Sequence, residues 1–110
     1  MDLVAQALAD ETRRAILRML RDGELAAGAI AGAFDVTRPA ISRHLRVLRE
    51  AGLVQVRAEG QRRVYSLDPR PLSELDAWLA PYRRLWAHRL DALDTEIARG
   101  RRARGQEDGR

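Results

Sequence analysis

Residues 37–54 read TRPAISRHLRVLREAGLV, and this stretch decides the fold. Its apolar residues are spaced by four and three, which predicts a helix with one inward face. Thr37 is a suitable N-cap, and Pro39 falls in the first turn, where its missing N–H costs nothing. Gly52 follows Ala51 and predicts the end of the helix. The inward residues are Ile41, Leu45 and Leu48.

Three shorter helical patterns precede this stretch. Apolar residues recur at helical spacing from Leu3 to Leu8, and Asp10 is a good N-cap for a second helix that ends near Gly23. A small third helix is expected over about residues 27–34, with Ala31 allowing a close crossing by the next helix. The residues expected to hold the helix after Thr37 from inside are Phe34, Val36, Ile41 and Leu45.

The pattern changes period after the decisive stretch. Alternating residues 53–58 and 62–67 flank a glycine-containing turn, which predicts a β-hairpin. A long final helix is expected from Leu72, and Pro81 should kink it or split it in two. Residues 101–110 are nearly devoid of apolar side chains and predict a basic, disordered tail.

The predicted order is therefore four helices, a hairpin and a long helix. Two short helices joined by a few residues and followed by a hairpin form the winged helix-turn-helix arrangement. The fold class we expect is mainly α with a small β-hairpin wing. Residues 1–100 are expected to form one domain, since 110 residues are close to the common domain size.

The composition excludes several classes of function. The chain has no cysteine, which removes disulfides, thiolate metal sites and cysteine nucleophiles. It also lacks a Ser-His-Asp context, a glycine-rich phosphate loop and a buried-looking carboxylate pair, so we expect neither an enzyme nor a cofactor. The N-terminal residues include acids and no long apolar run, which predicts a cytoplasmic protein without a signal peptide or membrane contact.

The positive charge is concentrated in the middle third of the chain. Residues 36–70 hold eight arginines against three acids, whereas residues 1–35 hold four against six. Such a segment is expected to face a polyanion. The second helix of a helix-turn-helix enters the DNA major groove, where arginine can pair with guanine and serine can contact bases or phosphates. The outward set of that helix is Thr37, Arg38, Ser42, Arg43 and Arg46.

Residues 8–17, 37–54 and 57–67 resemble the ArsR family of winged-helix repressors. The final helix, WLAPYRRLWAHRLDAL at residues 78–93, is similar to the non-metal-sensing, autorepressor-type branch. One departure is Asp35, which stands where the turn usually has glycine and is a residue that tolerates left-handed geometry. The resemblance implies a homodimeric repressor on double-stranded DNA, with Pro39 facing the groove too. It also implies that the hairpin reaches phosphate or the minor groove through Arg57, Arg62 and Arg63.

The resemblance further implies a dimer formed by the first and last helices on an inverted-repeat operator. Three aromatic residues of the last helix are read as core or dimer seam in preference to a ligand pocket, and His44 as structural or phosphate-contacting. The interface set is Leu3, Val4, Leu8, Leu75, Trp78, Leu79, Tyr82, Trp86, Leu90 and Leu93.

Two alternatives remain open beside a constitutive DNA-binding regulator. One is a winged helix that serves as a protein-interaction module. The other is a sensor switched by metal or by a small molecule. In the metal-sensing branch, aligning Asp76 with the first ligand puts Trp78, Arg89 and Ala92 where histidines are required, so no metal site is expected.

Overall fold

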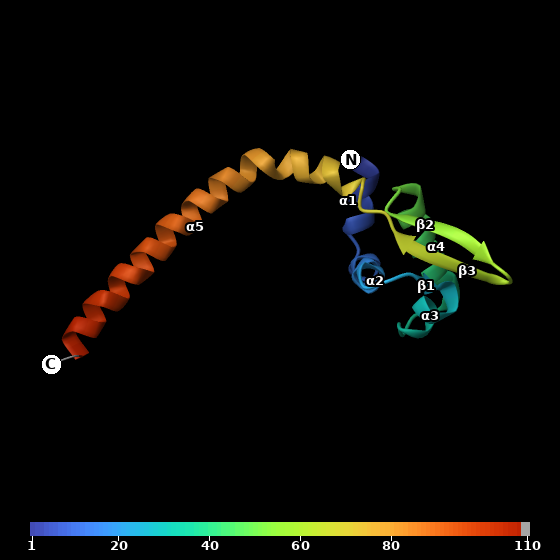
Figure 1. Cartoon of the computed structure of the whole chain (residues 1–110), viewed down its shortest axis with the longest axis horizontal. Helices are drawn as coiled ribbons and strands as arrows, with labels where there is room; N and C mark the ends of the chain where they lie inside the picture. The colour runs from blue at the N-terminus through green and yellow to red at the C-terminus, as the bar shows by residue number, and fades with distance from the viewer. Residues whose placement is uncertain (109–110) are drawn as a thin grey trace. The chain divides into compact units, whose positions relative to one another are not determined.

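The computed structural model describes residues 1–108, with side chains described for residues 1–100. That part of the chain holds five helices and three strands (Figure 1). The chain divides into two compact units, Met1–Asp76 and Ala77–Arg110. No helix within the described residues is both long and apolar enough to cross a bilayer.

The first unit begins with four helices, each at the place that the sequence predicts. Asp10 caps the second helix, since its Oδ2 accepts a hydrogen bond from the backbone N–H of Arg13 at 3.0 Å. Thr37 caps the fourth, since its Oγ1 accepts from the backbone N–H of Ala40 at 3.3 Å. Gly52 takes a left-handed conformation (φ +76°) just after the C-cap of that helix. The helices are α1 (Asp2–Leu8), α2 (Glu11–Arg21), α3 (Ala27–Gly32) and α4 (Arg38–Glu50).

The predicted hairpin is confirmed, and it belongs to a larger sheet. Strands β2 (Val54–Glu59) and β3 (Arg62–Leu67) pair antiparallel around a turn in which Gly60 has φ +63°. A strand that the sequence did not predict, β1 (Leu25–Ala26), pairs with the other side of β3, so the sheet order is β1-β3-β2. Two residues are too few to show an alternating pattern, so only the fold reveals this strand.

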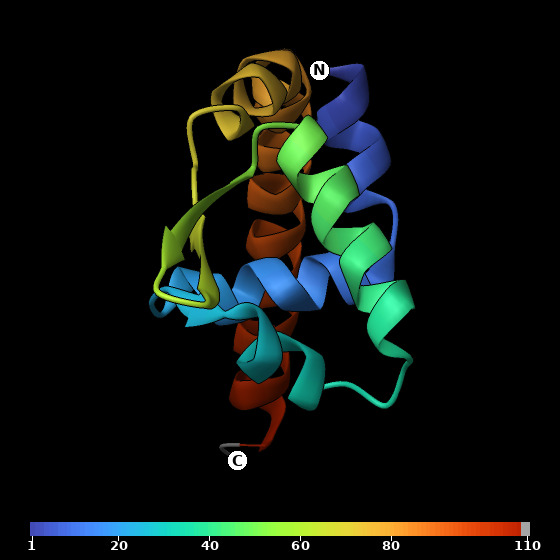
Figure 2. The same ribbon diagram turned by 90° about the vertical axis from the view of Figure 1, so that its right-hand side faces the viewer.

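The core of the first unit holds the inward face of α4 in place. Ile41, Leu45 and Leu48 are buried, as the spacing predicted, and they share one apolar cluster with α1, α2, α3 and the sheet. In Figure 2, α4 (green) lies beside α1 (dark blue) and crosses α2 (light blue). Burying one side chain of this size stabilises the folded state by about 1.5–3 kcal/mol. Burial of these three therefore fixes which face of α4 is turned to solvent.

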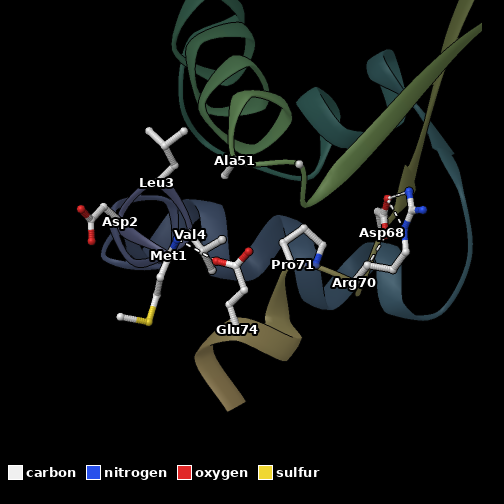
Figure 3. Close-up of a pocket in the computed structure, with 10 residues that line it drawn as sticks. Met1, Asp2, Leu3, Val4, Ala51, Asp68, Arg70, Pro71 and Glu74 are labelled. Atoms are coloured by element: carbon white, nitrogen blue, oxygen red, sulfur yellow. Dashed lines mark hydrogen bonds and ion pairs between the residues drawn. The ribbon is translucent and has the colours of Figure 1, made fainter. Parts of the chain in front are cut away.

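A buried carboxylate anchors the segment between the sheet and the last helix. Asp68 accepts hydrogen bonds from the Arg70 backbone N–H at 3.1 Å, from Arg70 Nη2 at 2.6 Å and from Gln55 Nε2 at 2.9 Å. The Arg70 guanidinium, aided by these hydrogen bonds, holds the pKa of Asp68 well below its usual range. Figure 3 shows the Asp68–Arg70 pair just before Pro71.

The last helix, α5, runs from Leu72 to Asp108. Of the two outcomes expected at Pro81, a kink or a split, the split is wrong, since Pro81 lies inside one continuous helix; a kink stays a prediction. Proline removes one backbone hydrogen bond, and the carbonyl it leaves free belongs to the exposed residue Ala77, which water can reach. The backbone of residues 101–108 continues this helix, whereas the sequence predicted a disordered tail over residues 101–110; residues 109–110 lie outside the described residues.

Candidate nucleic-acid interface

The outward face of α4 carries the residues that the sequence assigned to DNA. Between the buried members of the inward stripe, Ser42, Arg43 and Arg46 are exposed to solvent, whereas His44 and Val47 are half-buried. Thr37 and Pro39 are exposed at the N-terminal end of the helix, where a base-reading helix makes its contacts. The exposed residues of the face are Arg38, Ser42, Arg43 and Arg46.

The arginines of this face are available to a ligand. None of Arg38, Arg43 and Arg46 has a hydrogen-bond or ion-pair partner among the residues described. A guanidinium carries five N–H donors and stays charged at any ordinary pH. Three such groups on one exposed helix face form a surface that favours phosphates and guanine edges.

The turn before α4 differs from the expectation in two details. Val36 was expected to hold the helix from inside, but it is 43% exposed, so this prediction is wrong. The turn points the Val36 side chain outward just before the Thr37 cap, whereas Phe34 packs against the core, as predicted. Asp35 does not use left-handed geometry, since no residue other than glycine has a positive φ in the described chain.

The wing arginines fall into two groups. Arg62 and Arg63 are exposed, and the described structure gives them no bonding partner. Arg57 is also exposed, but its guanidinium forms an ion pair with Glu24 through both carboxylate oxygens and bonds Glu59 Oε2 at 2.9 Å. The Glu24 and Glu59 carboxylates raise the pKa of Arg57 above its usual value. Two carboxylates thus neutralise Arg57, and phosphate would have to compete with both.

Glu24 is the residue of this cluster that sequence reasoning missed. It lies 33 residues before Arg57, in the link between α2 and β1, and β1 itself was not predicted. Glu59 stands opposite Arg62 in the hairpin register, yet its carboxylate bonds Arg57 instead. Arg62 therefore keeps its donors free. No sequence signal joined Glu24 to the wing.

A second polar cluster lies where α2 meets α4. Arg13 Nε donates to the Ala7 carbonyl at 2.8 Å and its Nη2 donates to the Gln6 carbonyl at 2.9 Å. Its Nη1 lies 3.2 Å from Nδ1 of His44, which in turn lies 3.7 Å from Asp10 Oδ2. Arg13 thereby joins the C-terminal end of α1 to α4.

The predicted dimer residues of the first unit are not equally exposed. Leu3 is 54% exposed, Leu8 is half-buried, and Val4 is 3% exposed and belongs to the core of the unit. Leu75 at the start of α5 is half-buried. Leu3 is therefore the member of this group with most apolar surface left for a partner.

The second unit exposes most of its large apolar side chains. Leu79 is half-buried, and the Trp78 and Tyr82 rings lie 4.9 Å apart, tilted by 34°. Leu85 and Ile97, which were not in the predicted interface set, are exposed as well. The exposed members of the predicted set are Trp78, Tyr82, Trp86, Leu90 and Leu93.

An open hollow of about 720 Å³ lies in the first unit, between the start of α1, Gly52 and the first turn of α5 (Figure 3). None of the residues assigned to DNA lines it. Within the part of the chain described, no three His, Asp or Glu side chains gather in a way that could hold a metal ion.

Comparison with known proteins identifies the fold and the helix-turn-helix. A family model described as a helix-turn-helix domain matches residues 8–57. The HTH-type transcriptional regulator Rv2034 of Mycobacterium tuberculosis is 54% identical over 74 residues, which cover 67% of this chain and 69% of the relative. The transcriptional repressor SdpR of Bacillus subtilis is 38% identical over 79 residues, which cover 72% of this chain and 88% of the relative.

Solved structures of transcriptional regulators also resemble this chain. The crystal structure of an ArsR family transcriptional regulator matches with a TM-score of 0.71 and 32% identity, covering 78% of this chain and 89% of that chain. The relatives include named repressors and one named activator, HlyU of Vibrio cholerae. The winged helix-turn-helix fold and the expectation of a regulator, not an enzyme, are thus confirmed. This chain belongs to the ArsR family of DNA-binding, winged helix-turn-helix transcriptional regulators.

Proposed function

We propose that this regulator is a homodimeric repressor that reads an inverted-repeat operator through α4. The observation that supports this most directly is the exposed face of α4, whose three arginines have no bonding partner in the described structure. In a twofold dimer, two such helices would enter successive major grooves about 34 Å apart. Bound there, the dimer would block access to a promoter.

The residues divide into two roles in this proposal. Those on α4 read base edges, and those on the wing hold the backbone. Thr37 and Pro39 lie at the end of α4 that enters the groove, and Arg62 and Arg63 take the phosphates beside it. The base-reading set is Arg38, Ser42, Arg43 and Arg46.

Recovery of bound DNA tests the proposal. Purified protein is mixed with sheared genomic DNA, and the retained fragments are sequenced; we expect one inverted repeat to be enriched. Binding should weaken steeply as salt rises, because arginine–phosphate contacts release counterions. A protein-interaction module would enrich no sequence, and that outcome would overturn the proposal.

The variant Arg43→Ala tests direct readout. Removing a base contact should weaken binding to the selected operator by about 1–3 kcal/mol and leave binding to random DNA nearly unchanged. An equal loss of affinity on both duplexes would reassign Arg43 to the backbone.

Repression, as opposed to activation, is supported by the relative SdpR, a named repressor of which this chain covers 88%. A reporter gene placed behind the selected operator should be silenced when the protein is expressed. Higher reporter output would show that the protein activates transcription and does not repress it. We infer a cytoplasmic location, where a regulator meets its DNA, and we assign DNA binding and dimerisation to residues 1–100 with residues 101–110 as a basic tail.

We also propose that the protein belongs to the non-metal-sensing branch and takes no cofactor. The chain has no cysteine, and Trp78, Arg89 and Ala92 occupy the positions at which last-helix sensors need histidines. Arsenite, Zn²⁺, Cd²⁺ and Ni²⁺ should therefore neither raise the Tm nor release the protein from its operator. Specific stabilisation by one of these ions would contradict this assignment.

A further inference from the structure

A small hollow beside the DNA-facing helix is lined by hydrogen-bond donors and by apolar groups. Its volume is about 280 Å³, and no acidic residue lines it. One lining residue comes from α2 and the others come from one side of α4. They are Arg13, Ala40, Arg43, His44 and Val47. Two arginines without a carboxylate give the hollow a net positive charge.

The guanidinium of Arg13 is held in place at this hollow. Its Nε and Nη2 donate to the carbonyls of Ala7 and Gln6, and its Nη1 contacts His44. A guanidinium has five N–H donors, so two remain for a ligand. Because its partners at α1 are neutral carbonyls, the positive charge of Arg13 is not cancelled by them.

The contact with Arg13 also determines which nitrogen of His44 carries the proton. Arginine can only donate, so Nδ1 of His44 must accept, and the neutral ring carries its proton on Nε2. No acceptor in the described chain takes that Nε2–H. The Asp10 carboxylate accepts from the Arg13 backbone N–H, and its Oδ2 lies 3.7 Å from Nδ1 of His44, on the ring edge away from Nε2; Asp10 does not line the hollow.

We propose that this hollow binds a phosphate group through Arg13 and His44, whereas Arg43, which also lines it, keeps its role at a base edge. An oxyanion suits it because the lining residues offer two cations and an N–H donor and include no carboxylate. If the proposed DNA binding is right, on which the choice of DNA as the source rests, the hollow adjoins the exposed face of α4 and the phosphate belongs to the duplex backbone. A free phosphate compound is the other source of the same chemistry.

Fluorescence anisotropy with labelled duplexes tests the site. The main variant is His44→Leu, which removes the N–H donor without changing the formal charge; His44→Gln keeps a donor. Arg49→Ala, on α4 but outside the hollow, is the charge-loss control. His44→Leu should weaken binding roughly 10-fold on the selected operator and equally on a scrambled duplex, because backbone contacts carry no sequence information. His44→Gln should bind close to wild type, and Arg49→Ala should weaken binding less than His44→Leu.

A duplex with one neutral methylphosphonate separates contact from an indirect effect on α4. At one position of the operator, neutralising the phosphate should weaken the wild type and leave His44→Leu unchanged, because each change removes the same interaction. If the methylphosphonate weakened binding by the same factor in wild type and in His44→Leu at every position, a DNA phosphate would not bind at this site. A folded His44→Leu variant with wild-type affinity would also contradict the proposal.

Inorganic phosphate tests the other source. Side-chain ¹⁵N–¹H spectra of the wild type are compared in phosphate and in chloride at equal ionic strength, with His88, the other histidine, as internal reference. If no duplex binds, the proposed function fails, and a shift at His44 alone still supports the hollow as a phosphate site. If neither phosphate nor any duplex affects His44, the inference is wrong.

Discussion

At the scale of single residues, Thr37 determines where α4, the helix proposed to read DNA, begins. Its hydroxyl accepts from the Ala40 backbone N–H, one of the four amides that the first turn leaves without a helical partner. Thr37→Ala should lower the free energy of unfolding by about 1 kcal/mol, measured by urea denaturation at fixed protein concentration. Thr37→Ser keeps the hydroxyl and should remain near wild type. Equal destabilisation in both variants would show that the methyl group, not the cap, stabilises the helix.

Asp68 makes the stability depend on pH. Its pKa is lower in the folded protein than the ordinary value of about 3.9, so folding favours the ionised form. Its contribution is therefore complete above about pH 4 and is lost as the pH falls further. Asp68→Asn should lower the Tm at pH 7, and the difference from wild type should shrink below about pH 4. A difference that stays constant from pH 7 to 3 would contradict this role.

At the scale of elements, local signals predicted α4 better than its surroundings. The Thr37 cap, the inward stripe and Gly52 all lie within the helix or next to it, so the sequence alone predicted both ends and the exposed face. Strand β1 has two residues and no period of its own. The partners of Arg57 and His44 were missed for a related reason: they come from segments far away in the chain, and tertiary structure alone brings them together.

The wing offers a prediction at this scale, because its arginines differ in pairing. Arg62→Ala and Arg63→Ala should each reduce the slope of log K against log salt by about 0.9 for every phosphate that the variant no longer neutralises. Arg57→Ala should change the slope less, since Glu24 and Glu59 already neutralise this guanidinium. Anisotropy titrations between 50 and 200 mM KCl, roughly the range over which phosphate contacts show their effect, would measure all three. A slope change at Arg57 equal to that at Arg62 would show that DNA displaces the two carboxylates.

At the scale of the whole molecule, the exposed apolar side chains of α5 indicate a surface that another chain covers. Tyr82, Trp86, Leu90, Leu93 and Ile97 follow at intervals of four, four, three and four, which places them on one side of the helix. All five are exposed in the single chain. Proteins that stay monomeric rarely expose a continuous patch of large apolar side chains, and a second copy of the helix would cover this one.

Leu90→Glu is the variant that tests this dimer, because Leu90 is 54% exposed and lies within the stripe. A twofold interface would bury two carboxylates at a cost of at least about 3 kcal/mol, so the dimer dissociation constant should rise roughly 100-fold or more in sedimentation equilibrium. Operator affinity should fall with it, since a monomer engages one half-site. Ala98→Glu adds the same charge off the stripe and should leave both quantities unchanged. A wild-type chain that sediments as a folded monomer at micromolar concentration would mean that something other than a second copy covers α5.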